Sequence, residues 1–109
     1  MAEQDPESIN EDFAPRRGAA VYAVEVDGEA VLLDESANRL HHLNHTAALL
    51  WACFDGHVRS SELAADIAEE LQLPYEQVLN DALVVIRNLG SEGLLDGVRP
   101  TLPKESDEP

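Results

Sequence analysis

The residues best suited to chemistry lie together in one stretch of the chain, NRLHHLNHTAALLWACFDG, from Asn38 to Gly56. Three of the four histidines, the single cysteine and the single tryptophan fall within it. Imidazole and thiolate groups are zinc ligands, and a cysteine beside a histidine base can act as a nucleophile. The stretch therefore raises the hypotheses of a metal site and of a catalytic site, against the alternative of a strand that leads into a core helix.

A zinc site needs three or four side chains that converge at bonding distance. In a strand, His41 and His42 point to opposite faces, so at most one of them could join His45 or Cys53. His45 and Cys53 are eight residues apart in the sequence, which puts them about two turns from each other on a helix. The pattern favours histidines that pack or face solvent, and we expect neither a metal nor another cofactor.

A cysteine nucleophile needs an exposed thiol with a base in hydrogen-bond reach. Cys53 lies between Trp51 and Phe54 in an apolar helical stretch, which predicts a buried, structural cysteine. The carboxylates are spread over the ends and the helix surfaces, without a paired-carboxylate motif. We therefore expect that the chain is not an enzyme.

Three strands are predicted ahead of the helices. The runs VYAVEV (Val21–Val26) and EAVLLD (Glu29–Asp34) flank Asp27-Gly28, which is a strong signal for a type I′ hairpin turn. The turn ESAN then leads to a third short strand, RLHHL, at residues 39–43. Consecutive antiparallel strands form a meander, whose outer strands have unpaired N–H and C=O groups.

Three helices are predicted to follow. Asn44 is a good N-cap for the first, which Gly56 is well placed to stop. Ser60 is predicted to cap the second, whose apolar stripe ends before Pro74. Pro74 suits the start of the third helix, which continues to Gly90 or just beyond. The order βββααα predicts an α+β fold.

The third helix has an unusually wide apolar face. At 100° per residue its apolar side chains fill an arc of about 160°, wider than the stripe of a typical surface helix. Part of this face is therefore expected to extend beyond the core. The side chains in the arc are Val78, Leu79, Ala82, Leu83, Val85, Ile86 and Leu89.

Length and composition fit one domain, since 109 residues with 44% hydrophobic residues can bury a modest core. The ends are rich in Pro, Asp and Glu, so residues 1–19 and 98–109 are predicted to be disordered tails around a domain at 20–97. A net charge of −15 argues against binding to nucleic acid or to an anionic membrane. The sequence has no long apolar run and no recognisable signal peptide, so we expect a cytoplasmic protein.

Several motifs of the chain occur together in one known family. They are LLDE at the end of the second strand, the Leu43-Asn44 pair, LLWACFDG, the helix SSELAADIAEEL, and NDALVVIRNLGSEGLL with Asp81. In this order they resemble the PqqD family, whose members are also called RiPP recognition elements. The resemblance spans roughly residues 20 to 96.

This resemblance implies a winged-helix-like fold of three antiparallel strands and three helices, with no catalytic residues. Members of the family bind the leader segment of a ribosomally made precursor peptide and present it to a modifying enzyme. For PqqD itself that enzyme is a radical SAM protein of pyrroloquinoline quinone biosynthesis. The leader pairs along the third strand and lies against the third helix, which correspond here to Asn38–Leu43 and Glu76–Leu89.

We therefore expect a peptide-binding site in which the strand backbone supplies hydrogen bonds and the third helix an apolar groove. The candidate residues are Arg39, Leu40, His41 and His42 in the strand, with Leu79, Leu83, Ile86 and Arg87 in the helix. Three alternatives stay open: an adaptor for the modifying enzyme without leader affinity, a homodimer that pairs through the exposed strand, and a winged-helix nucleic-acid binder. The last is disfavoured because Arg87 is the one basic residue of the third helix.

Overall fold

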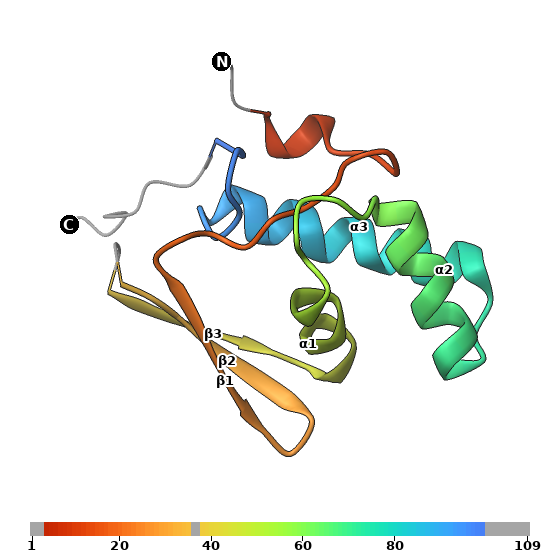
Figure 1. The fold of residues 1–109 in the computed structure, drawn as a ribbon, viewed down its shortest axis with the longest axis horizontal. Helices are drawn as coiled ribbons and strands as arrows, with labels where there is room; N and C mark the ends of the chain where they lie inside the picture. The colour runs from red at the N-terminus through yellow and green to blue at the C-terminus, as the bar shows by residue number, and fades with distance from the viewer. Residues whose placement is uncertain (1–3, 36–37, 100–109) are drawn as a thin grey trace.

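A computed structural model describes residues 4–35 and 38–99 of the chain. A short 3-10 helix precedes a three-stranded sheet, and three α-helices follow (Figure 1). The bounds are η1 Pro6–Ser8, β1 Val21–Val26, β2 Glu29–Asp34, β3 Arg39–Leu43, α1 His45–Ala52, α2 Ser60–Leu71 and α3 Tyr75–Ser91. The predicted α+β class and the order βββααα are confirmed. None of the helices among the described residues has the length and apolarity needed to cross a membrane.

The sheet is an antiparallel meander in the order β1-β2-β3. Its first turn is tight because Asp27 and Gly28 both take positive φ angles, 54° and 83°, as a type I′ turn requires. Ala30, Leu32 and Asp34 of the central strand are buried on the face that the helices cover. Of the predicted turn ESAN, Ser36 and Ala37 lie outside the described residues.

The core forms where α1 meets the sheet and the other two helices. Leu43, Trp51 and Phe54 are all buried, as the helical spacing predicts. The rings of Trp51 and Phe54 meet edge to face with centroids 5.9 Å apart. Aromatic pairs in this geometry contribute about 0.5–1.5 kcal/mol beyond their buried area. The aromatic residues of the stretch from Asn38 to Gly56 are therefore structural.

The prediction that Cys53 is buried is wrong, because its side chain is exposed. Helix α1 ends at Ala52, and Cys53 is its C-cap, with a backbone N–H that donates to the carbonyl of Leu50 at 3.0 Å. The prediction assumed that the helix continued through Cys53. Because the helix ends at Ala52, helical spacing does not determine where the thiol points. Phe54 lies beyond the end of the helix and still reaches the core.

The two helix starts that the sequence predicts have different outcomes. Asn44 caps α1, since its Oδ1 accepts a hydrogen bond from the N–H of Ala47 at 2.9 Å. Ser60 is not the cap of α2 but its first residue, and its hydroxyl donates to the carbonyl of Phe13 at 2.8 Å. The backbone of Arg59 precedes the helix and donates to Glu62 Oε1 at 3.0 Å. A contact with a distant segment has thus taken the place of the predicted local cap.

Residues 4–19 differ from the solvated tail that their composition predicts. They cross the tops of α2 and α3, with Ile9 only 1% exposed (Figure 1). The side-chain atoms Nε and Nη2 of Arg87 donate to the carbonyl of Ile9, at 3.1 and 2.8 Å. The segment is held by backbone bonds and single apolar side chains, so it has no periodicity to detect. Residues 1–3 and 100–109 of the predicted tails lie outside the described residues.

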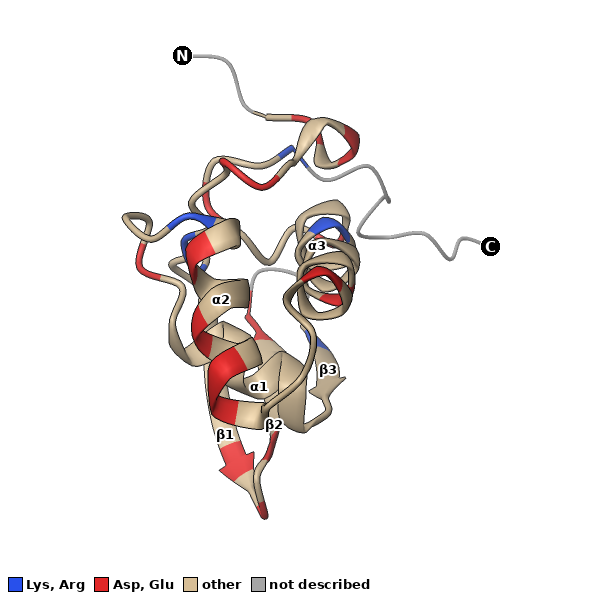
Figure 2. Ribbon diagram, turned by 90° about the vertical axis from the view of Figure 1, so that its right-hand side faces the viewer, with Lys and Arg blue, Asp and Glu red and all other residues tan. Residues whose placement is uncertain are grey.

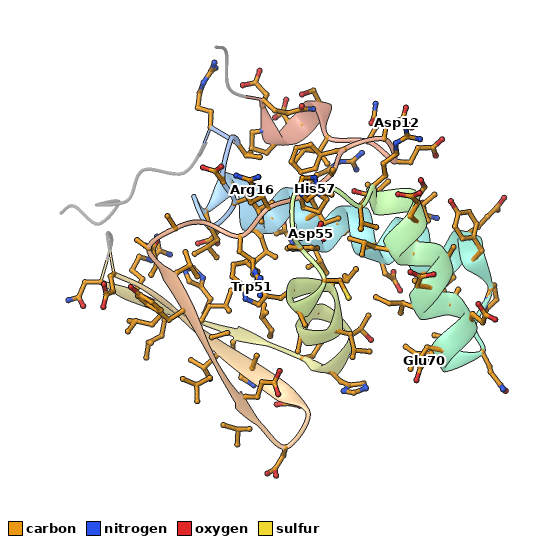
Figure 3. All side chains as sticks on the ribbon, in the orientation of Figure 1. Asp12, Arg16, Trp51, Asp55, His57 and Glu70 are labelled. Atoms are coloured by element: carbon orange, nitrogen blue, oxygen red, sulfur yellow. The ribbon has the colours of Figure 1, made fainter. Side chains whose placement is uncertain are left out.

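The same segment also contacts the loop between α1 and α2. Figure 3 shows Arg16 beside Asp55 and His57, and the backbones of Arg16 and Asp55 form an antiparallel bridge. Gly56 has a φ of +82°, and a Cβ there would lie 2.7 Å from Arg16 Nε. The Oδ1 of Asp55 accepts N–H bonds from His57 at 2.8 Å and Val58 at 3.2 Å, which lowers the pKa of this carboxyl below 3.8.

Candidate functional site

A groove of about 420 Å³ runs between β3 and α3. Residues of β3 and of the start of α1 form one wall, and residues of the second half of α3 and its C-cap form the other. The lining residues are Leu40, His41, His42, Leu43, Asn44, Ala47, Val85, Asn88, Leu89 and Glu92. A smaller hollow of about 290 Å³ shares Asn44 and Val85 with this groove and continues past Thr46, Asp81 and Val84.

The strand wall of the groove is an open sheet edge. β3 pairs with β2 on one side, and no strand among the described residues pairs with its other side. An edge strand presents alternate N–H and C=O groups that an added strand can pair with. The groove therefore offers backbone hydrogen bonds along one wall and side-chain contacts along the other.

An ion pair connects the two walls at one end of the groove. Arg39 Nη2 donates to Glu92 Oε1 at 3.1 Å, and His41 Nδ1 lies 3.7 Å from the same oxygen. Partly exposed pairs of this kind contribute only about 0–1 kcal/mol to stability. Their main effect is geometric, because they hold the strand edge and the end of α3 at a fixed separation.

His41 has one nitrogen without a partner. Its Nε2 is buried and forms no hydrogen bond within the described part of the chain. A buried polar atom without a partner costs about 1–3 kcal/mol. A polar group of a ligand, or a water molecule, that reached this nitrogen would remove that cost.

The other two histidines of the stretch from Asn38 to Gly56 form local hydrogen bonds. His42 Nε2 donates to Glu29 Oε1 at 2.8 Å, and His45 Nδ1 donates to the carbonyl of Gly28 at 3.0 Å. Within residues 4–35 and 38–99, no three His, Cys, Asp or Glu side chains are grouped so that they could hold a metal ion. The three histidines thus have separate neighbours, which are Glu92 after α3 for His41, Glu29 on β2 for His42 and Gly28 in the hairpin turn for His45.

The structure brings the predicted strand residues to the groove. Leu40, His41 and His42 line it, and Arg39 closes its end through Glu92. The exposed edge that the meander predicts is therefore next to a cavity large enough for side chains.

The predicted helix residues lie on a different flank of α3 from the groove. Ile86 has no exposed surface, and Arg87 is bonded to the carbonyl of Ile9. Leu79 and Leu83 are partly buried against the core and do not line the groove. The helix wall consists of Val85, Asn88, Leu89 and Glu92. A signal for this wall was present in the sequence, because these four residues recur at the spacing of one helix face.

A comparison with known protein families identifies the family of this chain. Residues 29–95 match the family described as Coenzyme PQQ synthesis protein D (PqqD). The chain belongs to the PqqD family. The matched residues include both walls of the groove, from β2 to the end of α3. No curated protein matches the chain.

Two solved structures share the PqqD fold of this chain. One is the solution structure of the PqqD truncation of Methylobacterium extorquens PqqCD, described as a functional and stand-alone RiPP recognition element. It has a TM-score of 0.72 and 19% identity, and the match covers 84% of this chain and 97% of that one. The other is TbiB1 in complex with the TbiA(beta) leader peptide, with a TM-score of 0.69, 24% identity, and coverage of 77% and 98%.

Proposed function

We propose that this PqqD-family chain is a non-catalytic peptide chaperone, which binds the leader segment of a ribosomally synthesised precursor by strand addition and presents it to a modifying enzyme. The observation that carries the proposal is the unpaired edge of β3 facing a groove of about 420 Å³. The leader would pair with this edge as a fourth strand. Its alternate side chains would then enter the groove beside α3.

The lining of the groove indicates which side chains it accepts. Val85, Leu89 and Ala47 supply an apolar floor, whereas Asn44 and Asn88 supply amide groups. A leader with apolar residues at alternate positions and a polar residue beside the amides fits this lining. The net charge of −15 favours a leader that is neutral or basic over an acidic one.

The comparisons support this role. TbiB1, which has the same fold, is in complex with a leader peptide, and the truncated PqqCD protein is described as a functional recognition element. The proposal also includes a radical SAM enzyme as the partner, which rests on family membership, and a cytoplasmic location, which rests on the sequence alone. The proposal includes precursors of pyrroloquinoline quinone and of other ribosomal peptide products.

A nucleic-acid function receives no support from the geometry of α3. Its one basic side chain, Arg87, donates to the carbonyl of Ile9 and is partly buried. Phosphate binding needs several free Lys or Arg side chains on one face.

The test is an amide NMR titration of the labelled protein with the leader of the precursor peptide encoded nearest the gene. Saturable shifts are expected in β3 and in residues 84–92, because the groove lies between them. A scrambled leader of the same composition is the control. Equal shifts with both peptides, or no shifts with the genuine leader, would reject the proposal.

A further inference from the structure

The sheet has a second face, which points away from the helices and is mostly apolar. The strand register places Tyr22, Leu33 and Leu40 in one row across it, and Val24, Val31 and His42 in the next. Residues paired across strands share a face, so these side chains form one surface, here called the outer face. Its exposed residues include Tyr22 at 53%, Val24 at 61%, Val26 at 54% and Leu40 at 70%.

No helix or strand among the described residues covers the outer face. Figure 1 shows α1, α2 and α3 on the opposite side of the sheet, where Ala30 and Leu32 are buried. A sheet with one solvated face normally carries polar residues there. Clustered exposed apolar side chains of this kind mark interaction sites in soluble proteins.

The surroundings of the outer face are acidic. Glu25, Asp27, Glu29 and Glu35 are exposed on or beside the β1–β2 hairpin, and residues 21–35 contain no Lys or Arg. Figure 2 shows this as acidic segments on β1 and at the tip of the hairpin. If a partner buried the outer face, the residues at the border of its contact surface would therefore lie next to these carboxylates.

The charge decides between two classes of partner. A second copy of this chain would bring an identical acidic hairpin and a further net charge of −15 against the first, which is unfavourable. A different protein with an apolar patch surrounded by Lys and Arg has the complementary pattern. Tyr22 suits the centre of such an interface, since tyrosine is enriched among residues that dominate binding energy.

We propose that the outer face is the docking surface for the modifying enzyme, which contacts it through an apolar patch with a basic rim. The identification of the partner as the modifying enzyme rests on the proposed function. The groove and the outer face lie on different sides of β3, and both Leu40 and His42 belong to the groove lining and to the outer face. Tyr22 and Val24 on β1 do not line the groove, so this part of the outer face stays available to the enzyme when a peptide occupies the groove.

The test measures two affinities on one double variant. Tyr22→Thr with Val24→Thr removes apolar area from the outer face, while threonine keeps a high strand propensity. The purified modifying enzyme encoded beside the gene is expected to bind this variant at least about tenfold more weakly, as loss of a central aromatic contact does elsewhere. Affinity for the leader peptide is expected to stay within about twofold, because Tyr22 and Val24 do not line the groove.

Leu73→Thr is the matched control, because Leu73 is an exposed apolar residue, at 41%, in the turn between α2 and α3. It is expected to change neither affinity. Circular dichroism and thermal unfolding establish that both variants are folded.

Three results would overturn the inference: unchanged enzyme binding by the folded double variant, no enzyme binding by the wild type, or a dimer in sedimentation that the double variant dissociates. The last would assign the outer face to a second copy. Absence of leader binding by the wild type, with enzyme binding still sensitive to Tyr22 and Val24, would instead reject the proposed function and leave the docking surface in place.

Discussion

The two flanks of α3 have similar apolar side chains but different neighbours. One flank is closed by the N-terminal segment, where Ile9 is buried and its Cδ1 would lie 3.5 Å from a Cβ on Gly90. The other flank, with Val85 and Asn88, faces the groove beside β3. Apolar side chains stabilise the fold where the chain covers them, and are available for binding where it does not. The covering segment, more than the helix itself, thus determines which flank is a site.

The largest effect that separates the flanks is expected from Ile86→Ala. Ile86 is fully buried, and truncation of a core isoleucine costs about 2–5 kcal/mol. Urea denaturation should show this loss in the free energy of unfolding, with unchanged leader affinity for the fraction that stays folded. Val85→Ala is the comparison on the open flank, and an equal loss of stability there would remove the distinction.

A charge placed on each flank should affect different properties. Val85→Asp puts a carboxylate into the groove and is expected to weaken leader binding at least about tenfold, because an unpaired charge must be desolvated there. Leu83→Asp, on the closed flank, is expected to lower stability and to leave the leader affinity of the folded protein unchanged. Isothermal titration calorimetry and urea denaturation measure the two quantities, and a reversed pattern would place the leader on the closed flank.

The bond that seals the closed flank can be removed on its own. Arg87→Ala removes both hydrogen bonds to the carbonyl of Ile9 and is expected to cost about 1.5–3 kcal/mol, as hydrogen bonds to charged groups do. Amide hydrogen exchange should increase at Ser60 and Ser61, whose N–H groups donate to carbonyls of the same segment at 2.7 and 3.0 Å. Unchanged exchange would show that Arg87 does not hold the segment.

The smallest effect concerns Asp55, beside the same segment. Its pKa is lowered below 3.8, mainly by the N–H of His57, so its contribution to stability is present above that value and lost as the pH falls through the folded-state pKa. A carbon-detected NMR titration should give a midpoint below 3.8 for this carboxyl. Asp55→Asn is expected to remove this acid-range dependence and to leave leader binding unchanged. A midpoint at or above 3.8 would contradict the hydrogen-bonded turn.

Local patterns were sufficient to predict the strands and the hairpin. The runs around Asp27-Gly28 have a period of two, and the structure places all three strands at the predicted bounds. Asn44 likewise caps its helix as predicted, since a cap acts over only three residues. The strand wall of the candidate site followed from the same reasoning.

The helix wall could not be chosen from the sequence, because a helical wheel shows which residues share a face and not what covers it. The covering segment has only a few apolar side chains, among them Ile9 and Phe13, and is held largely through its backbone, so its composition predicted a solvated tail. Ser60 was interpreted as a cap for the same reason, since its partner Phe13 is distant in the sequence. Both differences come from one long-range contact.

The ends of the described chain lie side by side. The N–H of Gln4 donates to the carbonyl of Gly97, and the N–H of Arg99 donates to the carbonyl of Gln4, both at 2.9 Å. Neither Gln4 nor Arg99 lines the groove. A domain tethered at either end would therefore be anchored at the same point of the surface, and linker length would set its effective concentration at the peptide site. A second domain fused to either end of this chain would thus leave the edge of β3 open to a peptide.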